Sequence, residues 1–199
     1  TTASVNDLQT LIDKNTALLS YFVGNEKIYI FSITVDDFKM WEVDKIKKFD
    51  DKVEEFNEVI LSYKEDKVKK YHKLAYELYN QLLPLDFPKN INRLIIVPDG
   101  IIGTISFDAL FTEEYTGEVK KYTDFPFLVY KYNISYVYSG NLFYNTFSDN
   151  EIWQNERPSK DWFGIAPVFK EDNKLEFMGS NVETLPGTEE EINTIEQYL

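Results

Sequence analysis

Residues 44–83 contain neither glycine nor proline, and this restricts the fold strongly because those two residues are the usual interruptions of a helix. Apolar residues recur there at helical spacing in two stripes, the first at Phe49, Val53, Phe56, Val59 and Ile60 and the second at Val68, Tyr71, Leu74, Ala75, Leu78 and Leu82. A polar interval near residues 62–66 separates the stripes, and Pro84 ends the second one. The sequence therefore predicts two long amphipathic helices in succession.

Strand-like segments flank these helices. KIYIFSIT at residues 27–34 and FKMWEV at residues 38–43 are rich in β-branched and aromatic residues, and the short polar link between them predicts a hairpin. RLIIV at residues 93–97 is continuously apolar, as in a central strand covered on both faces. Pro98-Asp99-Gly100 predicts a turn, after which residues 101–107 are expected to return as a strand.

The remaining elements are shorter. Ser4 and Asp7 have capping-box spacing, which predicts a short amphipathic helix that ends near Asn15. A strand is expected at residues 128–138, a helix at 140–147, a buried strand at 162–165, and polar loops at 148–160 and 170–184. Thr188 and Glu191 predict the capped start of a last helix, within which the chain ends, so we expect a fold that is incomplete at its C-terminus.

Charge and composition exclude several classes of function. The net charge of −13 disfavours binding to nucleic acid or to anionic lipid and favours a basic or neutral partner. The chain has no cysteine, which excludes a disulfide framework, a zinc–cysteine cluster and a cysteine nucleophile within these residues. No segment resembles a signal peptide or a membrane span, so we expect a cytoplasmic protein without a membrane partner. No metal site and no cofactor are predicted.

The candidate polar residues all have a structural interpretation. His72 stands among lysines on a predicted helix, so we expect a surface or half-buried residue. Asp99 suits turn chemistry better than catalysis. Ser106 lacks the context of a nucleophile elbow, and Gly100 and Gly103 form no phosphate loop. The acid pairs lack the alternation of a calcium loop, which favours solvated surface, at Asp36-Asp37, Asp50-Asp51, Glu54-Glu55 and Glu113-Glu114.

Four stretches of the chain form an ordered set: RLIIVPDG at residues 93–100 with ISFDAL at 105–110, the segment 128–142, WFGIAPVF at 162–169, and LPGTEEEI at 185–192. Together they resemble the CHAT family, whose members are caspase-like. Their order and approximate spacing also resemble the family pattern. Residues 17–24 with the hairpin are similar to the segment that commonly precedes this domain. We accordingly divide the chain into residues 1–92, which precede or open the domain, and residues 93–199, its front part.

The resemblance implies a caspase-like three-layer α/β/α sandwich and a His–Cys dyad. Neither dyad motif occurs in the chain, so the resemblance places both residues after Leu199. It also implies that the loop after residues 162–165 helps line a substrate pocket, with Ala166, Pro167 and Val168 as the substrate-binding candidates. That pocket would be less acidic than in relatives that carry acids there; alternatively, these residues are a strand end packed into the core.

Three functions follow as hypotheses. The first is the N-terminal part of a caspase-like cysteine endopeptidase of a bacterial protein, inactive alone, with helical repeats of the TPR type N-terminal to it in the whole protein. The second is a non-catalytic scaffold that presents tyrosine-rich surfaces to a protein partner. The third, a nucleotide-binding α/β domain, is disfavoured because no glycine-rich phosphate loop follows either apolar strand. Protein or peptide partners are expected in the first two, with self-association of the chain through strand edges.

Overall fold

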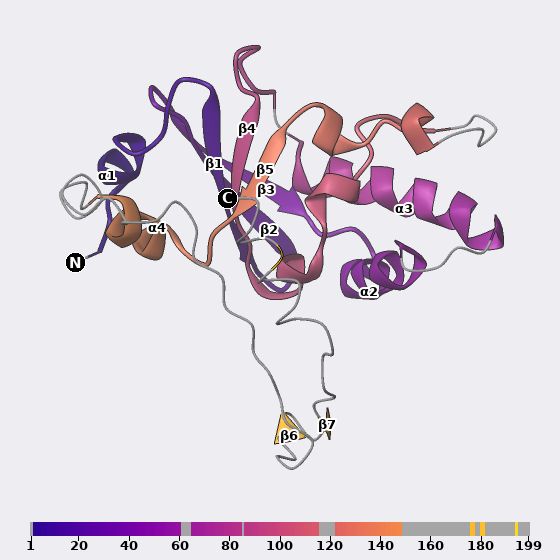
Figure 1. Ribbon diagram of the computed structural model, residues 1–199. Helices are drawn as coiled ribbons and strands as arrows, with labels where there is room; N and C mark the ends of the chain where they lie inside the picture. The colour runs from indigo at the N-terminus through magenta and orange to yellow at the C-terminus, as the bar shows by residue number, and fades with distance from the viewer. Residues whose placement is uncertain are drawn as a thin grey trace. The chain divides into compact units, whose positions relative to one another are not determined.

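The computed structural model describes residues 2–60, 65–84, 86–115, 122–148, 176–177, 180–181 and 194. The chain divides into two compact units, residues 1–149 and 150–199, which are considered separately. The first unit is built around a five-stranded sheet with the strand order β3-β2-β1-β4-β5 (Figure 1). The predicted α/β class is therefore confirmed, as a mixed sheet with helices.

The sheet combines the predicted hairpin with three parallel strands. β2 (Lys27–Ile33) and β3 (Phe38–Asp44) pair antiparallel, as the sequence predicted. β1 (Thr16–Val23) pairs antiparallel with β2 and parallel with β4 (Arg93–Val97). β5 (Asn133–Tyr136) lies parallel to β4 at the edge of the sheet. Because β1, β4 and β5 run in the same direction, their carboxyl ends meet at one edge.

Helices lie on both faces of this sheet. In Figure 1, α2 (Phe49–Ile60) and α3 (Glu65–Leu82) lie on one side, and α1 (Val5–Gln9) and α4 (Gly140–Phe147) lie on the other. The alternation of β1 explains both layers, because Leu19 belongs to the larger core cluster with α2 and α3, whereas Leu18 belongs to a smaller cluster with α1 and α4. A strand that is apolar on both faces needs cover on both, and the helices provide it.

The predicted strand at residues 101–107 is wrong. These residues form two 3-10 helices, η1 (Gly100–Thr104) and η2 (Phe107–Ala109). Both sides of β4 in the sheet are already occupied, by β1 and β5, so the returning chain cannot pair with β4. Gly100 begins the turn with a φ of +51°, a conformation that favours glycine. Two further 3-10 helices follow, η3 (Tyr122–Asp124) and η4 (Leu128–Tyr130).

Two predicted boundaries also shift. The strand expected at residues 128–138 is confined to β5, because Leu128 is buried in η4 instead. The first long helix begins at Phe49, the first residue of its predicted apolar stripe, and the buried side chain of Gln81 engages the link before it. The Gln81 amide donates to Asp44 O and accepts from Ile46 N. The capping box at Ser4 is confirmed, but α1 already ends at Gln9.

In residues 150–199 the structure describes a short hairpin and one further residue. β6 (Glu176–Phe177) pairs with β7 (Ser180–Asn181), so the polar loop predicted at residues 170–184 contains two short strands. Thr194 is helical, in agreement with the helix predicted after Thr188. The loop predicted at residues 148–160, beyond Ser148, the strand predicted at 162–165 and the cap at Thr188 lie outside the described residues.

Candidate functional site at the carboxyl edge of the sheet

The carboxyl ends of β1, β4 and β5 meet at the edge where open α/β sheets usually bind their ligands. Asp99 follows β4 at this edge and is half-buried. Its Oδ2 atom accepts a hydrogen bond of 2.7 Å from the backbone N–H of Val23, the last residue of β1. Its side chain makes no capping hydrogen bond to η1. Asp99 therefore ties the ends of two parallel strands together, which is more than the turn role that the sequence predicted.

Tyr136 occupies the carboxyl end of β5 and links it to η2. Its hydroxyl accepts a hydrogen bond of 3.0 Å from Phe107 N and donates one of 3.1 Å to Asp108 Oδ2. Burial is the main reason why the pKa of Tyr136 is raised to about 12. This phenol therefore stays protonated at neutral pH and acts as a hydrogen-bond donor, not as a base.

A shallow pocket of about 320 Å³ lies beside Tyr136. It is lined by Pro98, Gly103, Tyr136, Val137 and Tyr138. The Tyr138 side chain is 91% exposed, which is unusual for a large aromatic residue unless it meets a partner. Among the described residues, the lining offers ring surfaces and the hydroxyl groups of Tyr136 and Tyr138. With the lining that the structure describes, this pocket can bind an apolar or aromatic group.

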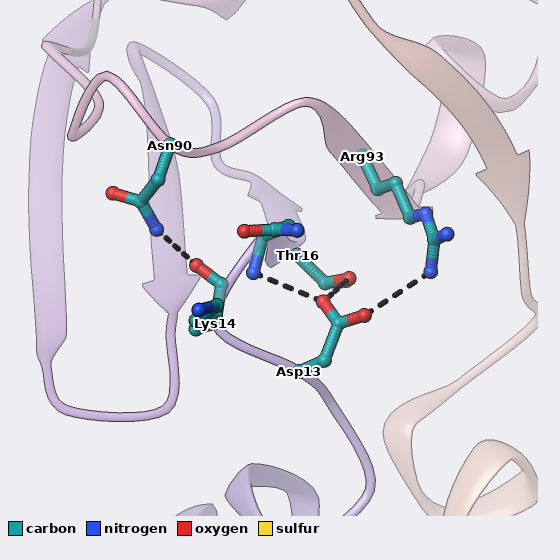
Figure 2. Close-up of polar contacts among 6 residues, drawn as sticks. Asp13, Lys14, Thr16, Asn90 and Arg93 are labelled. Atoms are coloured by element: carbon teal, nitrogen blue, oxygen red, sulfur yellow. Dashed lines mark hydrogen bonds and ion pairs between the residues drawn. The ribbon is translucent and has the colours of Figure 1, made fainter.

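The amino edge of the same strands is closed by a polar network (Figure 2). The Asp13 carboxylate accepts from Asn15 N at 3.0 Å and from Thr16 Oγ1 at 2.7 Å, and it pairs with Arg93 Nη1 at 3.1 Å. The Asn90 side chain donates to the backbone oxygen of Lys14. These hydrogen bonds lower the pKa of Asp13, and Arg93 adds to the effect. The network fixes the starts of β1 and β4 side by side.

His72 is buried, and the expectation of a surface or half-buried residue is wrong. Its side chain lies on α3 among aromatic rings, with ring centroids 4.7 Å away at Phe125, 4.9 Å at Tyr115 and 5.4 Å at Phe111. Only 7% of the residue is exposed, and Nε2 has no hydrogen-bond partner among the described residues. Lysines stand close to His72 in the sequence, whereas the rings around it are those of Tyr71 beside it and of Phe111, Tyr115 and Phe125. Local charge patterning could not reveal this environment.

The other predicted site residues do not come together. Ala166, Pro167 and Val168 lie outside the described residues, so their substrate-binding role stays a prediction. The acid pairs are on the surface as predicted, all exposed except the half-buried Glu55. Within the part of the chain that the structure describes, no group of His, Cys, Asp or Glu side chains could hold a metal ion. In the same part, no helix is long and apolar enough to cross a membrane.

Comparison with known families identifies the family of the chain. The CHAT domain matches residues 72–199, which is more than half of the chain. The chain belongs to the CHAT family. No curated protein matches it. The matched region begins within α3 and contains β4, the Pro98-Asp99-Gly100 turn, β5 and α4, so it includes the pocket at the carboxyl edge.

Membership in the CHAT family makes the absence of cysteine informative. The family is caspase-like, and this chain has no residue that could be the catalytic cysteine. The mixed five-stranded sheet with helices on both faces is consistent with a caspase-like CHAT fold. The predicted division at residue 92 stays a prediction, although one sheet joins β1–β3 with the CHAT-matched strands β4 and β5.

Proposed function

We propose that this chain is the N-terminal part of a caspase-like CHAT cysteine endopeptidase and that residues 1–199 are inactive alone. The observation that carries the proposal is the CHAT match over residues 72–199 in a chain without cysteine. A cysteine peptidase needs a thiolate and a histidine that can act as its base. The chain supplies one histidine, and His72 lies in an aromatic cluster on α3 instead of at the carboxyl edge.

In this proposal the first unit is part of a three-layer α/β/α sandwich, and the His–Cys dyad comes from outside residues 1–199. Ala166, Pro167 and Val168 would then line the pocket for the substrate residue before the cut, and their uncharged side chains would favour an apolar residue there. The partner would be a protein or peptide, with helical repeats preceding residue 1 in the whole bacterial protein. A cytoplasmic location belongs to the same proposal.

A non-catalytic interaction domain is the second candidate. The carboxyl-edge pocket and the 91% exposed Tyr138 favour it, because exposed aromatic residues beside a hollow are common at protein interfaces. Such a domain would bind its partner without any thiol chemistry. Self-association through the free edge of β5 would be a special case of the same function.

The first experiment exposes the purified chain to a mixed peptide library and follows the products by mass spectrometry. We expect no specific cleavage and no labelling by thiol-directed probes. The matched sample is the whole protein from the same gene, and its control is the same protein with the dyad cysteine replaced by alanine. Specific turnover by residues 1–199 that survives repurification contradicts the proposal. A whole protein that lacks the dyad shifts the assignment to the interaction domain.

A further inference from the structure

A second cavity, unrelated to the carboxyl edge, opens beside the β2–β3 hairpin. Its volume is about 200 Å³. The walls include Trp41 of β3 and Phe87 of the segment that leads into β4, and both rings pack against the larger core cluster. Figure 2 shows the hydrogen bond that the Asn90 side chain in that segment donates to the backbone oxygen of Lys14, and both residues line the cavity. The cavity therefore has fixed aromatic walls.

The floor of this cavity carries a polar group without a partner. Ser32 of β2 is only 6% exposed, yet it lines the cavity, and its hydroxyl makes no hydrogen bond to any described residue. Alternation along β2 places Ser32 on the same face as Ile28 and Ile30, which are fully buried in the larger cluster. The Ser32 hydroxyl oxygen is still open to solvent in the cavity, so a ligand that donates a hydrogen bond to it would take the place of water there.

The rim of the cavity is charged, and two of its carboxylates make no ion pair with the described residues. Asp36, Asp37 and Asp86 face two lysines, Lys14 and Lys39. Lys39 Nζ is 2.5 Å from Asp37 Oδ2, so these two charges offset each other. Asp36 and Asp86 make no ion pair with the described residues. The rim thus has one net negative charge, within a chain whose net charge is −13.

We propose that this cavity binds the arginine side chain of a basic segment in a partner protein. A volume of about 200 Å³ is smaller than that of pockets for cofactors or drug-sized ligands, and it suits one side chain. A guanidinium stacks on aromatic walls such as Trp41 and Phe87. Its five N–H groups can donate to Ser32 and to the carboxylates of Asp36 and Asp86 at the same time.

Arginine fits better than the other charged groups. The ammonium group of a lysine is compact, so it stacks poorly on aromatic rings. All its N–H donors are on one nitrogen atom, so they cannot reach several separate acceptors as a guanidinium can. An anion would have to approach Lys14 against the negative charge of the rim and of the whole chain. That net charge also increases the rate at which a basic segment meets the surface.

The test uses the ¹⁵N-labelled chain and a blocked Gly-Arg-Gly peptide, with shifts followed at the Ser32 amide and the Trp41 indole. One side chain should bind with a Kd on the order of 1 mM. The matched control peptide carries citrulline, which keeps the shape of arginine but has no charge. We expect the citrulline peptide to cause no saturable shift. A Gly-Lys-Gly peptide should bind at least threefold more weakly than the arginine peptide, a ratio of Kd values that corresponds to a fraction of 1 kcal/mol.

Three variants localise the interaction. Asp36→Asn and Asp86→Asn should each weaken binding about twofold to fivefold, the range for exposed ion pairs. Ser32→Ala should weaken it without changing the fold, and Asp51→Asn on α2 is the control that removes the same charge elsewhere. Equal binding of citrulline or lysine overturns the proposal. So do shifts that avoid Ser32 and Trp41, equal losses in Asp51→Asn, or saturable shifts caused by acetate instead of the arginine peptide.

Discussion

His72 shows how one residue can couple protonation to stability in this fold. Burial lowers its pKa below the ordinary value of 6.5, because the ring packs among Phe111, Tyr115 and Phe125 with Nε2 unpaired. Between the lowered pKa and 6.5 the unfolded chain binds more protons than the folded chain. The free energy of unfolding therefore falls as the pH drops through this window.

We expect His72→Phe to remove this part of the pH dependence. Phenylalanine keeps a ring in the aromatic cluster and cannot titrate. The difference in unfolding free energy between the two proteins, measured with urea from pH 5 to pH 8, should shift in favour of the variant as the pH falls. Each unit by which the pKa is lowered contributes about 1.4 kcal/mol. The carboxyl groups titrate in both proteins, so they cancel in the difference; parallel curves would contradict the expectation.

The residues that the sequence could not assign share one property. Asp99 was expected to serve its own turn, but its carboxylate bonds to Val23, which is remote in the chain. Tyr136 likewise bonds to Phe107 and Asp108 on η2. Patterns within a short window report local turns and faces, whereas these contacts depend on which strands become neighbours. Ser4 could be assigned, because both partners of its capping box lie within four residues.

Helix α4 begins at a defined cap, which makes it a suitable element for a quantitative prediction. The Ser139 hydroxyl accepts from Leu142 N at 3.1 Å. The helix buries Phe143 in the smaller core cluster with α1. Ser139→Ala should lower the free energy of unfolding by about 1 kcal/mol, whereas Ser139→Asn, which keeps an acceptor, should change it little. Urea denaturation of the three proteins at neutral pH measures the difference.

An equal loss in Ser139→Asn would show that something other than the cap is responsible. The matched position is Ser106, which precedes η2 without a side-chain capping bond. Ser106→Ala should therefore cost less than Ser139→Ala, although the two substitutions remove the same atom.

The type of an element could be predicted from the sequence where the spacing of its apolar residues matched the place it takes in the fold. The hairpin of β2 and β3 and the helices α2, α3 and α4 have unambiguous patterns and were predicted. Residues 101–107 have the composition of a strand, but they become 3-10 helices because β4 already has two partners. β1 was noted only for its resemblance to a preceding segment, yet it is the strand that joins the hairpin to the parallel part of the sheet. Whether such a segment becomes a strand depends on the order of strands in the sheet, and a short window of sequence does not contain that information.

At the scale of the molecule, residues 1–149 should fold by themselves. All five strands of the main sheet and both core clusters lie within them. Trp41 is the only tryptophan in this part, since the other two are Trp153 and Trp162. We expect the fragment 1–149 to unfold at the same urea midpoint as the full chain carrying Trp153→Phe and Trp162→Phe, when the fluorescence of Trp41 is followed in both.

The control is the fragment 1–92, which ends at the predicted domain boundary. This fragment lacks β4 and β5, so β1 would have no parallel partner strand. The larger core cluster would also lose Ile96 and Phe107, which leaves Leu19 and Tyr21 less covered. An unpaired central strand and an uncovered core favour unfolding or aggregation, so this fragment should show no cooperative transition. Cooperative unfolding of 1–92 would make the hairpin and the two helices a domain of their own. A lower midpoint for 1–149 than for the full chain would mean that residues 150–199 contribute to the stability of the first unit.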